Sequence, residues 1–518
     1  MTAAIVPQQA RPSAAPQNGY WERPFQHDTA GFEAPPARLN VVHMALIPKG
    51  PHQGRVLVWD LRGPQGPGPW KQRWAIVDPA DSSAPVFWNA ELSIPTGRGD
   101  LFCAGHAWTS DGELLVAGGT TAYPVIAGKL TYLWDPVGGA NGGWLRQPDM
   151  AETRWYPTVL LTDTGELLIA GGTRGRGLPE RNDYEVFVPY ARVGAWTRPA
   201  PARVFPGPQV AGGEFGLYPR LLQLETGEQF MAGENGVAVK MNHGLAPGQW
   251  TATDSFAWPI REHVNALLTP RAVGAPEVVW ALGGEAFDAA GSSLGVLDAV
   301  ESCTPGSPGA PAWDWSSRRP MREPRTSSNT VILPNGHVLV VGGRSSPEHL
   351  PEVPVLEPEL FDGTRWQTMA PGASPRTYHS TAVLLPSGKV LTGGGQSSTF
   401  DYQVFAPPYV LSRARPRVVS APPVLPWSSL DPSPRTVVFA ALPAGEAVTR
   451  VVLVAPGSVT HHFDASQRLV ELQVVDATAT SVSFLGPSHR AQAPRGYYML
   501  FVVTASGIPS VASWVIVG

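Results

Sequence analysis

The stretch SDGELLVAGG at residues 110–119 decides the fold, because the chain repeats it. In each copy a turn glycine is followed by alternating apolar residues and then by a Gly-Gly pair. Close copies are DTGELLIAGG at 163–172, PNGHVLVVGG at 334–343 and PSGKVLTGGG at 386–395. Weaker copies lie at 53–60, 225–234 and 276–284. Equivalent positions recur every 50–62 residues, a period typical of a β-propeller with several short strands in each blade.

Seven copies of this frame predict seven blades. The turn glycine starts a hairpin, and the Gly-Gly pair lets neighbouring backbones approach closely near the central channel. The frame stops after Gly395, and a Pro-rich connector precedes short alternating strands typical of an immunoglobulin-like β-sandwich. We therefore predict an all-β chain with a flexible N-terminal extension at 1–40, a seven-bladed β-propeller at 41–411 and a β-sandwich at 412–518.

The composition excludes several classes of protein. There are 38 basic and 42 acidic residues, a net charge of −4, and no basic run of the kind that binds nucleic acid or membrane surfaces. Gly and Pro number 55 each, but 43% hydrophobic residues and 18 Trp favour a packed fold rich in turns over disorder. The two cysteines, Cys103 and Cys303, exclude a disulfide framework.

The N-terminal residues lack the basic segment and apolar stretch of a secretory signal. No apolar run approaches the roughly 18 residues of a transmembrane helix. We therefore expect a cytoplasmic protein, a monomer without nucleic-acid or membrane partners; export by another route stays open.

Five residues far apart in the sequence carry the chemistry: Cys103, Tyr156, Tyr378, His379 and His461. Imidazole and phenolate ligands suit Cu(II). Adjacent side chains on an extended strand point to opposite faces, so Tyr378 and His379 can act on one ion only at an irregular point of the backbone. Taken singly, each residue has a structural alternative: a buried thiol, a packing aromatic ring or a hydrogen-bonded histidine.

The segments that hold these residues are LFCAGHAW, TRWYPTVLL, SPRTYHSTAVLL and GSVTHHFDASQR. In order and blade context they resemble the galactose oxidase and glyoxal oxidase family of copper-radical oxidases. The C-terminal run GYYMLFVVTASGIPSVAS resembles the last domain of that family. The resemblance covers about residues 40–518 and implies a kelch-type propeller followed by an immunoglobulin-like domain.

The resemblance also implies roles for the five residues. Tyr156, His379 and His461 would be equatorial ligands of one copper ion, and Tyr378 the axial ligand. Cys103 would form a thioether with the ring of Tyr156, which would hold a radical. Tyr378 would accept the hydroxyl proton of a primary alcohol or aldehyde substrate, and O2 would be reduced to H2O2.

The chain departs from galactose oxidases at two points. They place a tryptophan over the thioether just after the second Gly-Gly pair, where this chain has Arg174; His106 with Trp108, or Trp155, are candidates to fill that space. Where their sugar-contacting arginine follows Gly-Leu-Tyr, this chain has Pro219, with an arginine next. The RWYP segment instead resembles the glyoxal oxidase branch.

Three arginines are candidates for the substrate entrance: Arg174, Arg220 and Arg344. Together they would favour polar or anionic substrates, because a cluster of guanidinium groups attracts negative charge.

Three alternatives remain at the level of sequence. His462 is a rival ligand beside His461, although the family's Thr-His motif selects His461. A non-catalytic kelch propeller that binds a partner and keeps the copper site is the second. A propeller hydrolase or lyase is the third, but no pair of carboxylates stands at equivalent positions of the repeat to support it.

Overall fold

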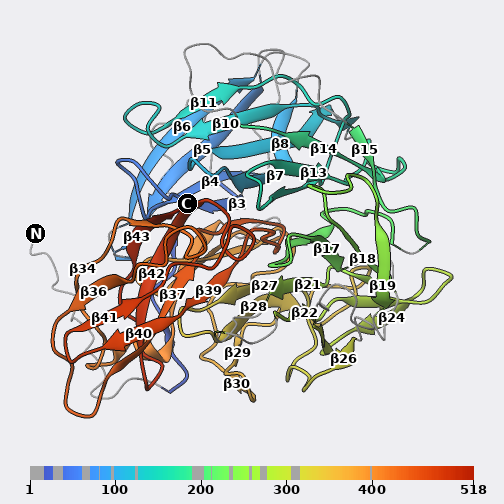
Figure 1. The fold of residues 1–518 in the computed structure, drawn as a ribbon. Helices are drawn as coiled ribbons and strands as arrows, with labels where there is room; N and C mark the ends of the chain where they lie inside the picture. The colour runs from blue at the N-terminus through green and yellow to red at the C-terminus, as the bar shows by residue number, and fades with distance from the viewer. Residues whose placement is uncertain are drawn as a thin grey trace, which may run out of the picture.

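The computed structural model is almost entirely β-structure (Figure 1). The residues that it describes are 17–26, 39–60, 70–80, 82–83, 85–94, 99–122, 126–189, 204–211, 213–232, 237–255, 260–268, 273, 277–304, 315–396 and 400–518. Within these ranges no helix is long and apolar enough to cross a membrane.

Antiparallel sheets follow one another along the chain and form the seven predicted blades (Figure 1). Blade 1 contains β3 (Val41–Leu46), β4 (Val56–Asp60), β5 (Trp70–Asp78) and β6 (Val86–Ile94). Blade 2 contains β7 (Asp100–Trp108), β8 (Leu114–Ala122), β9 (Ile126–Ala127), β10 (Thr131–Asp135) and β11 (Gly143–Arg146). Blade 3 contains β12 (Thr158–Leu161), β13 (Leu167–Ala170), β14 (Asp183–Phe187) and β15 (Val204–Pro206).

The second half of the propeller repeats this plan. Blade 4 contains β16 (Arg220–Gln223), β17 (Gln229–Ala232), β18 (Val237–Met241) and β19 (Thr251–Ser255). Blade 5 contains β21 (Asn265–Leu268), β22 (Val279–Leu282), β25 (Val300–Cys303) and β26 (Ser316–Ser317). Blade 6 contains β27 (Thr326–Ile332), β28 (Val338–Arg344), β29 (Glu359–Phe361) and β30 (Trp366–Thr368). Blade 7 contains β31 (Thr381–Leu384), β32 (Val390–Gly393) and β33 (Asp401–Ala406).

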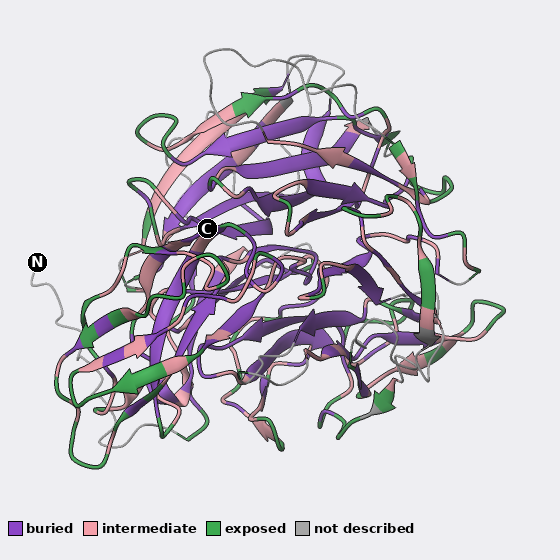
Figure 2. Ribbon diagram, viewed as in Figure 1, coloured by how far each residue is buried: buried purple, intermediate pink, exposed green. Residues whose placement is uncertain are grey.

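The repeated frame of the sequence forms the second strand of every blade: β4, β8, β13, β17, β22, β28 and β32. These strands are largely buried between neighbouring blades (Figure 2). A small extra sheet joins β20 (Ile260–Glu262), β23 (Glu285–Phe287) and β24 (Ser293–Val296) beside blade 5. The propeller prediction is thus confirmed, while Gly233 of the weak fourth copy lies outside the described residues.

The Gly-Gly pairs allow the close approach that the sequence predicts. Gly118 has a φ of +93°, and a Cβ there would lie 2.6 Å from the carbonyl oxygen of Arg154 in the next blade. Gly343 has a φ of +87°, and a Cβ there would lie 2.8 Å from the carbonyl oxygen of Thr326. Both the left-handed backbone and the lack of space require glycine.

A buried arginine joins each of several neighbouring blade pairs. The backbone carbonyls of Arg154, Arg325 and Arg376 accept hydrogen bonds from the second glycine, or its equivalent, of the preceding blade, at 3.2, 2.8 and 2.7 Å. Their guanidinium groups donate to the Gly-Gly pair of their own blade at 3.0, 3.0 and 3.2 Å. We call these residues the inter-blade arginines.

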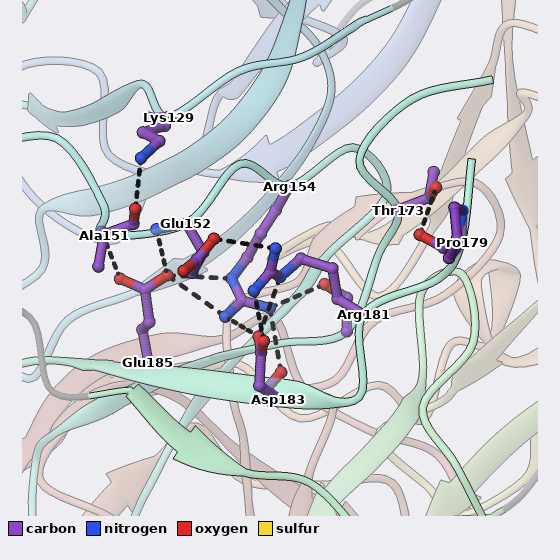
Figure 3. A network of polar contacts seen from close by, with 10 residues as sticks. Lys129, Ala151, Glu152, Arg154, Thr173, Pro179, Arg181, Asp183 and Glu185 are labelled. Carbon is purple, nitrogen blue, oxygen red and sulfur yellow. Dashed lines mark hydrogen bonds and ion pairs between the residues drawn. The ribbon is translucent and has the colours of Figure 1, made fainter.

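Each inter-blade arginine meets a carboxylate within its own blade. Arg154 binds Asp183 and Glu185 at the centre of a network that also includes Arg181 (Figure 3). Arg325 lies 2.7 Å from Glu359. A buried guanidinium requires such a partner, because an unpaired charge away from water is strongly unfavourable.

The C-terminal region forms the predicted immunoglobulin-like sandwich, after the short 3-10 helix η1 (Pro408–Leu411). One sheet contains β34 (Val418–Ser420), β36 (Arg435–Phe439), β41 (Ser481–Phe484) and β40 (Val474–Ala477). The other contains β35 (Val424–Leu425), β43 (Ser513–Val517), β42 (Gly496–Thr504), β37 (Val448–Val454) and β39 (Leu469–Leu472). Side chains such as Phe439, Leu453 and Leu500 form the core between them.

Two segments lie elsewhere than the sequence predicts. Strand β38 (Ser458–Thr460), expected within the sandwich, instead pairs with β3 and joins the sheet of blade 1. It lies in a loop between β37 and β39 that reaches into the propeller. Within the N-terminal extension expected to be flexible, β1 (Tyr20–Trp21) and β2 (Phe25–Gln26) pair with β33 of blade 7; 1–16 and 27–38 lie outside the described residues.

Removing the carboxylate from a buried inter-blade pair tests the role of these arginines. Glu359→Gln keeps the side-chain volume but leaves the charge of Arg325 uncompensated, so we expect a loss of about 3–5 kcal/mol in unfolding free energy. Chemical denaturation at neutral pH measures this. The matched control is Glu471→Gln, which removes a partner of the more exposed Arg450 and should cost about 0–1 kcal/mol. Equal losses in the two variants would contradict the prediction.

Candidate active site

A ring of left-handed residues surrounds one end of the propeller axis. Blades 2 to 7 each place a non-glycine residue with positive φ at or just before their first strand: Cys103 (57°), Tyr156 (63°), Tyr218 (46°), His263 (51°), Ser327 (55°) and His379 (69°). We call these six residues the axial ring. Such a conformation costs an L-residue roughly 1–2 kcal/mol and marks an irregularity that re-aims a side chain.

Backbone hydrogen bonds between blades hold this ring. The N–H of Tyr156 donates to the carbonyl of Cys103 at 3.0 Å, and the N–H of Tyr218 donates to the carbonyl of Tyr156 at 2.7 Å. The inter-blade arginines stand two or three positions earlier in the chain, as Arg154 does before Tyr156. The strained positions are therefore fixed from both sides, by the neighbouring blade and by their own.

The structure brings the five predicted residues together. The hydroxyls of Tyr156 and Tyr378 lie 2.7 Å apart. The Sγ of Cys103 lies 3.3 Å from Nε2 of His461. The nearest ligand atoms of Cys103, His379 and His461 all lie within 4.8 Å of one another. The irregular backbone that Tyr378 and His379 require is the left-handed conformation of His379.

His461 reaches this site because β38 is inserted into blade 1. It follows β38 directly and has a φ of +46°, and its neighbour His462 has +61°. The Nδ1 of His461 lies 2.7 Å from the hydroxyl of Thr460, which leaves Nε2 facing Cys103. A segment of the second domain thus completes a site that the propeller begins.

Burial keeps both imidazoles of the site neutral. Desolvation lowers the pKa of His379 to about 3 and that of His461 well below its usual value. The Nε2 of His379 is buried and has no hydrogen-bond partner among the described residues. A neutral imidazole with a buried nitrogen that lacks a hydrogen-bond partner has a lone pair with which it can bind a metal ion.

Burial acts on the phenols in the same way. It raises the pKa of Tyr156 well above its usual value, and the adjoining Cys103 and Tyr378 raise it further. Burial likewise raises the pKa of Tyr378, with a further contribution from Cys103. Without a nearby cation both hydroxyls hold their protons at neutral pH, so the two phenols and the two imidazoles are uncharged.

A chain of buried histidines supports Cys103 from behind. Its backbone N–H donates to Nε2 of His43 at 3.2 Å, so the proton of neutral His43 lies on Nδ1. That nitrogen lies 3.2 Å from Nε2 of His106, whose Nδ1 lies 2.6 Å from the hydroxyl of Ser458. His106, which the sequence indicates as a candidate beside the site, therefore links Cys103 to β38, the strand that His461 follows.

Trp155 packs against the ring of Tyr156. The two rings are 4.3 Å apart and inclined by 38°. Arg174 is exposed, and its backbone carbonyl accepts a hydrogen bond from Ala127. Of the candidates to fill the space left by the missing tryptophan, Trp155 is thus the one that contacts the ring.

A cavity of about 230 Å³ opens above the site. Tyr156, Tyr378 and His461 form its floor, and its remaining lining residues are Glu180, Gly216, Leu217, Tyr218, Arg220, Glu262, His263, Glu348 and His462.

Of the three arginines expected at the entrance, Arg174 and Arg344 are not among the described lining residues of this cavity. Arg220 lines the cavity. Arg344 is buried and donates to the carbonyls of Ser346, Pro347 and Leu350 instead, because the loop after β28 folds back over it.

Sequence reasoning missed Tyr218 and His263, two members of the axial ring. A signal was present: each stands two residues before the first strand of its blade, as Tyr156 and His379 do. Aligning the repeats on their first strands instead of on the Gly-Gly pair would have revealed it. Glu180, Glu262 and Glu348 left no such signal, because they lie outside the repeated frame.

Comparison with known proteins shows which class of protein the chain resembles. Residues 266–411 match the family model described as glyoxal oxidase N-terminus, and residues 415–517 match the galactose oxidase-like, early set domain. A galactose oxidase of Gibberella zeae is 27% identical over 487 residues, 89% of this chain and 67% of that protein. The aldehyde oxidase GLOX1 of Arabidopsis thaliana is 27% identical over 462 residues, 80% of this chain and 71% of that protein.

A solved structure agrees in fold. A fungal alcohol oxidase in complex with copper superposes with a TM-score of 0.74 at 22% identity, covering 96% of this chain and 99% of that one. The fold and the matched domains together define an oxidoreductase of the propeller-plus-sandwich class. Across both of its domains the chain is similar to the galactose oxidase and glyoxal oxidase family of copper-radical oxidases.

Two histidine variants separate the rival ligands. His461 faces Cys103 and His379, whereas Nε2 of His462 lies 3.3 Å from Arg220. We expect His461→Ala to weaken Cu(II) binding by more than the roughly 10–100-fold typical of residues outside a ligand set. His462→Gln should stay within that range. Titration of the purified protein with Cu(II), read by metal analysis after gel filtration, tests this, and the opposite ranking would refute the assignment.

Proposed function

We propose that this chain is a copper-radical oxidase that converts primary alcohols or aldehydes to aldehydes or acids while reducing O2 to H2O2. The observation that carries the proposal is the convergence of Cys103, Tyr156, Tyr378, His379 and His461 on one buried point beneath a cavity. A scaffold that only binds a partner has no need of this set.

The residues fit a copper ion. Tyr156, Tyr378, His379 and His461 would hold it, since two imidazole nitrogens and two phenol oxygens form the N,O donor set that Cu(II) prefers. The buried, unpaired Nε2 of His379 supports this fit. When bound, copper supplies a Lewis acid for the substrate oxygen and one of the two electron equivalents that alcohol oxidation requires.

Cys103 and Tyr156 would supply the other electron equivalent through a thioether. In forming it, the S–H bond and one ring C–H bond break, one C–S bond forms, and two electrons with two protons pass to O2 as H2O2. A sulfur substituent makes a phenol easier to oxidise. The contact between the Cys103 and Tyr156 side chains supports this step, and Trp155 over the ring shields the product from solvent.

Tyr378 would handle the substrate proton. Its hydroxyl borders the cavity and lies 2.7 Å from that of Tyr156. A phenolate at this point can accept the proton of a substrate hydroxyl, and the neighbouring Tyr156 can take the hydrogen atom from the substrate carbon. The products are an aldehyde and, after O2 accepts two electrons and two protons, H2O2.

The branch of the family follows from the departures in sequence. The match of residues 266–411 to the glyoxal oxidase model and the RWYP segment support an aldehyde or simple alcohol substrate. Pro219, where galactose oxidases have a sugar-contacting arginine, speaks against galactose.

Peptide masses test the thioether directly. Trypsin releases Cys103 within 99–129 and Tyr156 within 155–174. After treatment with Cu(II) and O2 we expect one species, lighter than the sum by a pair of hydrogen atoms and stable to reductant. Cys103→Ser should abolish it, whereas Cys303→Ser, which alters the buried thiol of β25, should not. Two free peptides from copper-loaded, air-exposed protein would exclude the radical mechanism.

Tyr378→Phe tests the proton acceptor. Loss of a positioned base lowers kcat by roughly 10²–10⁴-fold, while the peptides of 99–129 and 155–174 should still join. Peroxide release from a primary alcohol measures the rate, and mass analysis of the same sample measures the cross-link. An unchanged kcat would remove Tyr378 from the proton transfer.

A further inference from the structure

The wall of the cavity carries more negative than positive charge. Three carboxylates line it, from three separate sheets: Glu180 after β13, Glu262 at the end of β20 and Glu348 after β28. All three are exposed, as expected for groups that face an open cavity. We call these three residues the acidic mouth.

The one guanidinium in the cavity wall is committed to the fold. Arg220 is 2% exposed, and its Nε donates to the carbonyl of Val264 at 2.7 Å. Its terminal nitrogens contact the carbonyl of Tyr218 and Nε2 of His462. Even if Arg220 and a protonated His263 are each counted as a full positive charge, three carboxylates leave the mouth negative.

Neighbouring groups hold Glu348 in place. Its backbone N–H donates to the carboxylate of buried Glu285 at 2.8 Å. Its own carboxylate lies 3.5 Å from Nε2 of His263, and this contact lowers the pKa of Glu348. The ring of His263 lies 5.7 Å from that of Tyr378. The carboxylate of Glu348 is therefore separated from Tyr378 by the imidazole of His263.

A second observation points to a ligand in the same cavity. His462 is 2% exposed and lines the cavity, and its Nδ1 has no partner among the described residues. Because Nε2 faces an Arg220 donor, Nε2 is the acceptor of the ring and Nδ1 carries the N–H. A buried N–H without an acceptor is rare, and a substrate oxygen would satisfy this one.

We propose that the acidic mouth selects primary alcohols that carry a positively charged amino group and rejects those that carry a carboxylate. The hydroxyl end of the substrate would lie at Tyr378, and a substrate oxygen would accept the hydrogen bond from Nδ1 of His462. The ammonium group would lie among the three carboxylates of the acidic mouth. The cavity of about 230 Å³ suits a small molecule. This reverses the expectation of anionic substrates drawn from the arginines, and it rests on the proposed oxidase function.

Kinetics on a matched series tests the proposal. The substrates are straight-chain primary alcohols of equal length that end in an ammonium, a methyl or a carboxylate group. With the copper-loaded protein at neutral pH and low ionic strength, kcat/KM should fall in that order by about tenfold at each step, since charged clefts change local substrate concentration by roughly 10–10³-fold. High salt should compress the order.

Variants assign the effect to the mouth. Glu262→Gln combined with Glu348→Gln should shrink the ratio between the cationic and the anionic substrate by at least about tenfold. The control is Asp476→Asn, which removes one negative charge on β40 of the sandwich and should leave the ratio unchanged. Peroxide release from the neutral alcohol without any charge order would overturn this inference and leave the oxidase function standing.

Binding without turnover keeps the test independent of catalysis. The full-length protein before copper loading is titrated calorimetrically with butylammonium and with butyrate. Tighter binding of butylammonium, lost in the double variant, supports the acidic mouth even if no alcohol yields peroxide. Equal binding of the two ions, or a preference for butyrate, would refute it.

Discussion

The active site depends on one constraint, the axial ring of residues held in a left-handed backbone conformation. Each of these residues lies at or just before the first strand of its blade, where the left-handed conformation redirects the side chain. Cys103, Tyr156 and Tyr218 are joined by backbone hydrogen bonds from blade to blade, so the distortion of one supports the next. At roughly 1–2 kcal/mol for each position, six such residues would not persist in an isolated strand. They persist because the sheets on both sides are fixed.

What fixes the sheets is a repeated arrangement at the end of each blade. The Gly-Gly pairs bring neighbouring backbones into contact. The guanidinium groups of the inter-blade arginines donate hydrogen bonds to these glycines, and their buried positive charge requires a carboxylate partner. Glu359 for Arg325 and Asp401 for Arg376 are partners within the same blade. A buried ion pair adds little net stability. Its main effect here is to position the backbone, because each inter-blade arginine stands two or three residues before a residue of the axial ring.

The sequence predicted the propeller well because its signal is a repeat, and a repeat of glycines is visible without knowing any contact. It predicted the five central residues only through resemblance, since nothing local indicates that His461, in a second domain, meets Cys103. Residues 458–460 lie within the range predicted for the sandwich, and nothing in their sequence indicates that β38 pairs with blade 1. The acidic mouth could not be predicted, because loops outside the repeat place Glu180 and Glu348 beside a cavity that exists only in the folded chain.

Charge is divided between the floor and the wall of the cavity. The floor holds imidazoles and phenols whose shifted pKa values keep them neutral when buried, and it contains no carboxylate. Without a metal ion the two phenols are neutral, and with a divalent cation two phenolates would balance its charge. The buried centre would therefore carry no net charge in either state. A carboxylate ligand would break that balance, because it would carry a buried negative charge whenever the cation was absent. The carboxylates of the mouth are exposed to solvent instead, so the wall places no buried charge beside the centre. On the proposed function, the floor would keep one metal chemistry, and loops in the wall would decide which substrate reaches it.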